Sequence, residues 1–142
     1  MPDSSTPLTA PDAALLALRP ALSITSLDAA DTVGSFLHLT LRPVLKLQNQ
    51  RLLLVVADFV QDHHIPFRGA NATEQQRMVL ELLTRNTKLR YTIIGLMVGM
   101  FTTPELAFYR EHRAELNRRL LELAVRRVQD QTPEVAQLLT PA

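Results

Sequence analysis

Apolar residues recur every three to four positions over much of this chain, a spacing that places them on one face of an α-helix. The first long stretch runs from about Pro43 to His63, with a proline in its first turn and Ile65-Pro66 just beyond its end. Leucine and valine cover most of the circumference of this segment. We therefore expect a helix that is buried on most sides, either at the centre of the fold or as half of a dimer interface.

Two further helices are expected, over residues 73–86 and 87–101. Thr73 and Gln76 have the spacing of a capping box, in which side chains bind the free N–H groups of the first turn. The second of these helices is strongly apolar in its later part. It therefore reads as a core helix and not as the polar recognition helix of a helix-turn-helix protein.

The clearest helix start is the sequence Thr102-Thr103-Pro104-Glu105, which combines a capping hydroxyl, a proline at the first helical position and an acid near the positive helix end. Helical periodicity then continues to about Asp130. A helix of about 27 residues would be ~40 Å long, more than a domain of this size needs. This overhang, together with the first long helix that is apolar on most sides, predicts a homodimer. A second Thr-Pro-Glu, at 132–134, predicts a short closing helix through Leu139.

The beginning of the chain has a different composition, rich in Pro, Ser, Thr, Asp and Ala. We expect a loose N-terminal arm over 1–34, with a possible short helix over Asp12–Leu18. Ser35–Leu41 has leucines at alternate positions, which suits a strand, but a helical lead-in is equally compatible. The predicted fold is all-α, a bundle of four main helices with short terminal helices over 35–142, preceded by the arm.

The composition narrows the class of protein. The 142 residues suit one domain and include 46% hydrophobic residues, enough to fill a core. Fifteen basic residues against 14 acidic ones give no overall surplus for binding nucleic acid. Without cysteine there are no disulfides or thiolate sites. No apolar run approaches the ~18 residues of a membrane span, and the N-terminus has no signal-peptide pattern, so we expect a cytoplasmic protein without membrane insertion.

Two glycines, Gly95 and Gly99, lie four residues apart inside the helix predicted for 87–101. Each costs about 1 kcal/mol relative to alanine in a helix, so some compensating contact is expected. Close packing against another helix of the same chain is the favoured interpretation. A dimer contact, or room for an apolar ligand beside Met97, is the alternative.

Acidic and histidine residues gather at the end of the first long helix. Asp58, Asp62 and His63 lie close in sequence, and His112 is a possible fourth ligand for a metal ion. Adjacent histidines, here His63 and His64, diverge by about 100° on a helix and cannot chelate as an i, i+4 pair does. These residues are weak metal candidates, and no metal or other cofactor is expected.

Arginines are frequent in the helix predicted from Pro104 to Asp130. Glutamates are interspersed among them, the alternation typical of a solvated, ion-paired face. Arg113 and Arg127 are exceptions because they fall on the leucine face, where they extend to solvent or mark an interface. Glu81 and Arg85, on an earlier helix, have the i, i+4 spacing of an ion pair.

No nucleophile elbow, glycine-rich phosphate loop or metal motif is present, so an enzyme is the less favoured class. The sequence favours a non-enzymatic helical interaction or oligomerisation module that binds itself or another protein. A regulatory nucleic-acid-binding protein that uses the arginine-rich last helix is one alternative, although nucleic acid is an unlikely partner. A helical bundle that binds a small apolar ligand or a metal is the other.

Overall fold

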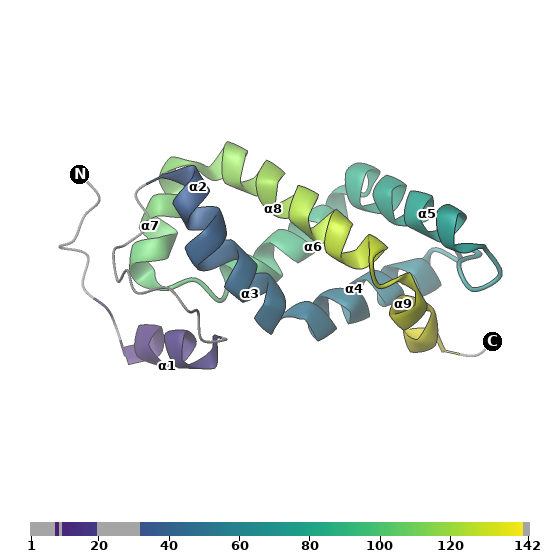
Figure 1. Ribbon diagram of the computed structural model, residues 1–142, viewed down its shortest axis with the longest axis horizontal. Coiled ribbons are helices and arrows are strands. Elements are labelled where there is room, and N and C mark those ends of the chain that lie inside the picture. Colours follow the sequence, from purple (N-terminus) through teal and green to yellow (C-terminus); the bar gives the residue numbers. More distant parts are fainter. Residues whose placement is uncertain (1–7, 9, 20–31, 141–142) are drawn as a thin grey trace. The chain divides into compact units, whose positions relative to one another are not determined.

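The computed structural model describes residue 8, residues 10–19 and residues 32–140, and every regular element in this part of the chain is helical (Figure 1). The all-α class is confirmed. The elements are α1 (Ala10–Leu18), α2 (Val33–Phe36), the π-helical segment η1 (Leu37–Leu41), α3 (Arg42–Leu47), α4 (Asn49–Asp62), α5 (Ala72–Arg85), α6 (Thr87–Val98), α7 (Thr103–Glu111), α8 (Arg113–Gln129) and α9 (Thr132–Leu138). Most of the arm predicted for 1–34 lies outside the described residues, but α1 covers the segment for which a short helix was expected.

The chain forms two compact units. The described residues up to Gln48 form the first together with Leu96–Leu120, and Asn49–Gly95 form the second together with the described residues from Leu121 onward. Both units therefore contain parts of α6 and α8. Contacts between segments that are distant in the chain define these units, whereas the division into an arm over 1–34 and a domain over 35–142 stays a prediction from composition.

The strand alternative for Ser35–Leu41 is wrong, since this segment is helical. Its last five residues form η1, after which the N–H of Arg42 donates to the carbonyl of Leu37, five residues earlier. Pro43 follows immediately, and a proline inside a helical run has no N–H and its ring collides with the preceding turn. The wider π turn accommodates that proline, so α2, η1 and α3 follow one another without leaving the helical conformation.

The long helix predicted for Pro43–His63 is interrupted at Gln48. This residue ends α3 with φ −93° and ψ 11°, and α4 begins at the next residue. Its side chain is buried and donates from Nε2 to the carbonyl of Leu96 at 3.2 Å. A glutamine is unremarkable in a helical pattern, so only this tertiary contact marks the break.

The 27-residue helix predicted after Pro104 is also wrong. It is broken at His112 into α7, of nine residues, and α8, of 17. His112 has φ −125° and ψ 30°, and its N–H donates to the carbonyl three residues back, at Tyr109. The overhang from which dimerisation was inferred is therefore absent.

Helix starts agree with the sequence where the cap is strong. The helix start predicted at residues 102–105 is confirmed, but α7 begins at Thr103, so Pro104 is its second residue and not its first. Thr102 forms a capping box in which Glu105 accepts the N–H of Thr102 at 2.8 Å. The box proposed at Thr73 is wrong, because α5 begins at Ala72 and is capped by Asn71, two residues before Thr73. The Oδ1 of Asn71 accepts the N–H of Glu74 at 2.8 Å.

Aromatic rings fill the core of the first unit. Phe36 is fully buried, stacks on Phe108 with ring centroids 5.0 Å apart, and meets Phe101 edge-on at 5.4 Å. Tyr109 packs edge-on against Phe101 and donates its hydroxyl to Asn117 at 2.7 Å. These contacts join α2, α7 and the segment that precedes α7.

In the second unit α9 packs against α4 and α5. The buried residues include Leu52, Leu53, Val56 and Val60 of α4, Val79 and Leu83 of α5, Leu89 and Ile93 of α6, and Val135 of α9. Polar contacts support this core, because Arg68 donates to the carbonyls of Ala136 and Leu139 at the end of α9. None of the described helices combines the length and the apolar composition that crossing a bilayer requires.

Candidate functional site

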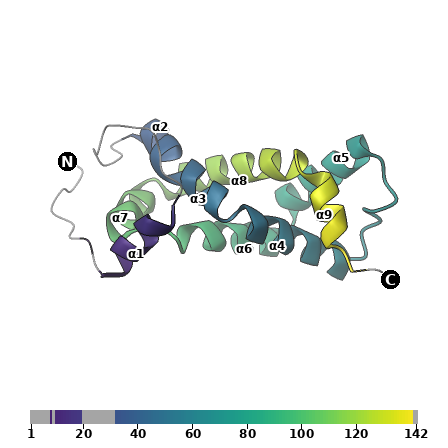
Figure 2. The ribbon, with the colours of Figure 1, turned by 60° about the horizontal axis from the view of Figure 1, so that its bottom comes forward.

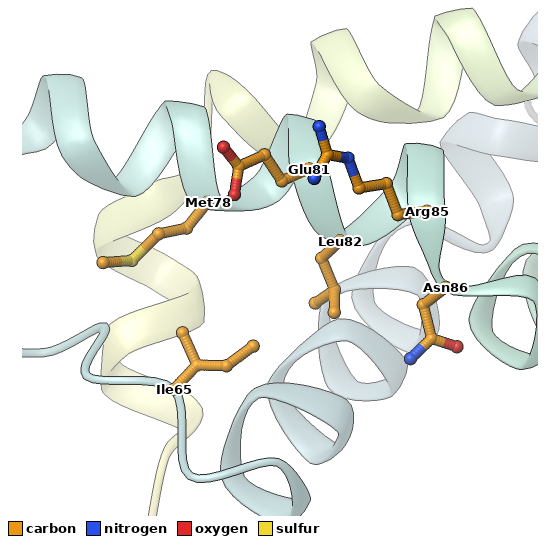
Figure 3. A pocket seen from close by; sticks show the side chains of 6 residues that line it. All are labelled: Ile65, Met78, Glu81, Leu82, Arg85 and Asn86. Carbon is orange, nitrogen blue, oxygen red and sulfur yellow. The ribbon is translucent and has the colours of Figure 1, made fainter.

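A hollow of about 380 Å³ opens beside α5 in the second unit (Figure 3). It is lined by Ile65, Met78, Glu81, Leu82, Arg85 and Asn86. Ile65, Met78 and Leu82 surround the space with apolar atoms, whereas Glu81 and Arg85 extend along the rim (Figure 3). Its size falls within the range of ~300–1,000 Å³ that is usual for binding sites.

The periodicity of α5 explains why these side chains share a face. Met78, Leu82 and Arg85 follow the i, i+4, i+7 spacing of one helix stripe, and Glu81 lies next to it. Val79 and Leu83 lie on the neighbouring stripe and are buried. The hollow therefore lies at the edge of the packed face of α5, where helix meets solvent.

The opposite wall comes from the turn after α4. His64 has φ 52°, a left-handed conformation that ends a helix, and the N–H of Ile65 then donates to the carbonyl of Val60 at 3.0 Å. This turn holds Ile65 half-buried against the hollow. A methionine and two branched aliphatic side chains give an apolar floor that can adapt to an entering group.

The charges on the rim are one acid and one base. No ion pair joins Glu81 to Arg85 among the described residues, so the i, i+4 pair expected from their spacing is not formed. Both side chains are exposed. They remain available to a partner that approaches the hollow.

A second polar feature lies in the first unit, at the start of α7. Arg19 donates from two guanidinium nitrogens to the two carboxylate oxygens of Glu105, at 2.6 and 2.5 Å, and from one of these nitrogens to the carbonyl of Met100 at 2.8 Å. Thr40 adds a hydroxyl donor to the same carboxylate at 2.9 Å. The side chains of Arg19 and Glu105 are only 7% and 16% exposed. Such forked, charge-assisted contacts are the strong class of hydrogen bond.

This environment shifts the pKa of Glu105. Burial alone would raise the pKa, but the hydrogen bonds and charge of Arg19, with the Thr102 N–H and the Thr40 hydroxyl, outweigh burial and hold it below its ordinary value. Among the described residues, Arg19 supplies the cation that faces this carboxylate, and Asp12 binds next to it, at the N–H of Thr103.

The pH dependence of stability follows from that shift. A carboxyl whose pKa is lower in the folded than in the unfolded chain stabilises the folded state at every pH above its pKa in the unfolded chain. This contribution is lost as the pH falls through the pKa of the carboxyl in the folded chain. We expect the urea midpoint of the natural chain to fall between neutral pH and about pH 3 more steeply than that of Glu105→Gln, which has no carboxyl there. Urea titrations followed by circular dichroism at several pH values measure both slopes. Parallel slopes in the two proteins would contradict this assignment.

The residues considered for metal binding do not form a site. His63 is exposed, stacks on Phe59, and donates from Nδ1 to the carbonyl of Phe59 at 2.9 Å. His112 belongs to the other unit, where its ring lies 4.4 Å from that of Phe108. No three His, Asp or Glu side chains of the described residues, Asp58 and Asp62 included, gather closely enough to hold a metal ion.

The two glycines do not form one notch in a helix. Gly95 lies within α6, but it is exposed, and a Cβ atom added there would meet nothing within 4 Å. Gly99 lies beyond the end of α6, in the turn that follows Val98. Neither Gly95 nor Met97 lines the hollow beside α5.

Arg113 and Arg127 are both engaged within the chain. Arg113 is exposed, and its guanidinium carbon lies 5.8 Å from the ring centroid of Tyr109. Arg127 is half-buried and donates to Oδ1 of Asn49 at 3.2 Å. Asn49 also exchanges two amide hydrogen bonds of 2.8 Å with Gln131. Arg127 thus joins a polar network at the start of α4.

Comparison with known proteins supplies no relative. The chain matches no protein-family model, and no curated protein or solved structure is significantly similar to it.

The sequence pattern missed the residues that the structure brings together most closely. Glu105 was recognised only as an acid near a helix start, and its partner Arg19 is 86 residues away in the chain. The sequence hinted at this ion pair only through the position of Arg19, a single cation directly after the run of alanine and leucine in α1. The hollow was harder still to predict from the sequence, because its walls come from two separate segments, α5 and the turn at Ile65.

Proposed function

We propose that this chain is a non-enzymatic helical interaction module that binds a second copy of itself through the α5 hollow. The observation that carries the proposal is the apolar hollow itself, rimmed by one exposed acid and one exposed base on the same helix. Its lining contains no nucleophile or histidine, which suits binding better than catalysis.

The arrangement of charges favours a second copy over an unrelated partner. Consider a two-fold axis that is perpendicular to α5 and passes it midway between Glu81 and Arg85. This axis places two copies of the helix side by side and antiparallel. Each Glu81 then faces Arg85 of the other copy, and each Arg85 faces Glu81. A surface that is complementary to itself in this way is what a symmetric dimer requires.

Apolar contact supplies the rest of the association. Met78 and Leu82 are half-buried in the single chain, and Leu82 lies between the two charge pairs along the helix, whereas Met78 lies just before them. In the antiparallel pair, Leu82 of one copy faces the hollow of the other. Each ~25 Å² of apolar surface removed from water contributes about 0.6 kcal/mol at ~25 cal/mol per Å².

Charge reversal tests this arrangement. We expect Glu81→Arg and Arg85→Glu each to weaken the dimer by about tenfold, because two attractive pairs, worth ~0.2–1 kcal/mol each, become repulsive. The double variant Glu81→Arg/Arg85→Glu restores the attraction and should associate like the natural chain. Sedimentation velocity over a micromolar concentration series gives the dissociation constant of each.

Leu80→Glu is the matched control on the same helix. Leu80 is 47% exposed, but two residues turn the helix by about 200°, so it lies on the side away from Leu82. It should leave association unchanged. A monomer mass for the natural chain throughout the micromolar range would refute self-association, and a dimer that neither charge reversal weakens would place the interface elsewhere.

A further inference from the structure

Helix α1 is attached to the first unit in an unusual way. It consists almost entirely of alanine and leucine, yet none of the apolar side chains of Pro11–Leu18 is buried. Leu16 is 43% exposed and Leu18 is 57% exposed. Apolar burial, which holds most surface helices in place, therefore contributes little to its attachment.

Polar contacts hold the helix at both of its ends. Near its start, Asp12 is only 2% exposed and accepts the N–H of Thr103 at 2.8 Å. Immediately after its end, Arg19 inserts its guanidinium between Glu105 and the carbonyl of Met100. Both contacts converge on the first turn of α7, and Figure 2 shows α1 beside that helix. The Nε of Arg19 is buried and has no hydrogen-bond partner among the described residues, so their fit around this side chain is incomplete.

We propose that α1 is a releasable helix, fastened to the first turn of α7 by a polar latch that consists of Asp12, Arg19 and Glu105. The latch has two states. In the closed state the charges are paired and shielded from water. When it opens, Arg19 and Glu105 regain hydration, which offsets much of the lost pairing, and little apolar surface is newly exposed. A nine-residue helix is unstable alone in water, so α1 unfolds when it is released. The inference is independent of the α5 hollow, which lies in the other unit.

Glu105→Gln is the sharpest test because it separates the latch from the helix cap. Glutamine at this position still accepts the N–H of Thr102, since a capping box tolerates glutamate or glutamine. Its neutral amide, however, cannot form an ion pair with Arg19. We expect amide hydrogen exchange across α1 to become on the order of tenfold faster, while exchange in α4 and in the later turns of α8 stays unchanged. Hydrogen-exchange mass spectrometry of the full chain at neutral pH measures each segment.

Three further variants make the result specific. Glu111→Gln removes an exposed acid from the same helix and should leave α1 unaffected. Arg19→Lys keeps the charge but loses the fork, so it should give an intermediate rate. Leu16→Ala should change exchange in α1 by less than about twofold, because this side chain contributes little packing.

The outcomes divide clearly. Faster exchange confined to α1 in Glu105→Gln supports the latch. Unchanged exchange in α1, or a uniform increase across the whole chain, would overturn it, because the pair would then be inert or a general element of the fold. A large effect of Leu16→Ala would likewise show that apolar packing holds the helix.

Discussion

Phe36→Ala is expected to lower the free energy of unfolding by about 3–5 kcal/mol, the usual cost of removing a fully buried phenylalanine. Phe36 has no exposed surface and contacts two other rings, Phe101 and Phe108. Removing its ring leaves a cavity and breaks aromatic pairs worth about 0.5–1.5 kcal/mol each. A chain of this length is stable by roughly 7–20 kcal/mol, so the loss is a large fraction of the total.

Tyr91→Ala provides the comparison for this variant. Tyr91 is 66% exposed, so its removal should change stability by less than about 0.5 kcal/mol. Urea unfolding, followed by circular dichroism for the natural chain and both variants, measures the difference. Equal midpoints for Phe36→Ala and Tyr91→Ala would contradict the aromatic core described for the first unit.

Leu53→Ala is expected to destabilise the chain by about 2–5 kcal/mol, whereas Leu54→Ala should cost less than about 1 kcal/mol. The two leucines are adjacent in α4, but Leu53 is 1% exposed and Leu54 is 47% exposed. The substitutions are chemically identical and have the same effect on helix propensity. The difference between them therefore isolates the burial of one side chain.

The same urea titration serves for this pair. Its result also tests the sequence-based expectation that the apolar helix around residues 43–63 is buried on most sides. If Leu54→Ala proves as costly as Leu53→Ala, that face of α4 is covered, either by a partner copy or by part of the chain. Repeating the titration at several protein concentrations distinguishes the two, because a dimer is stabilised by mass action.

A homodimer is expected both from the sequence and from the structure, but for different reasons. The sequence suggested a homodimer because a long helix was expected to extend beyond the domain and because the first long helix is apolar on most sides. The break at His112 removes the first of these reasons. The α5 hollow, with Glu81 and Arg85 on its rim, provides a different one. The charge-reversal variants of Glu81 and Arg85 test association through the α5 hollow, whatever the length of the last helices.

Local signals in the sequence were reliable where a few neighbouring residues decide the conformation. The start of α7 at Thr102 could be read directly, because the cap hydroxyl, the proline and Glu105 all lie within one helical turn. The helical class followed from the periodicity of apolar positions. At α5 the same reasoning failed by two residues, since Asn71 and Thr73 are both competent caps and only one of them begins the helix.

The sequence by itself determined that the chain is helical and where its strongest caps lie, because hydrogen bonding and side-chain periodicity within a helix involve residues at most a few positions apart. The tertiary structure alone decided the breaks at Gln48 and His112, the hollow between α5 and Ile65, and the pairing of Arg19 with Glu105. Each of these depends on packing or hydrogen bonds made in three dimensions, several of them between residues far apart in the chain. Contacts of that kind leave no periodic trace in the sequence, since any polar residue on either segment could have made them.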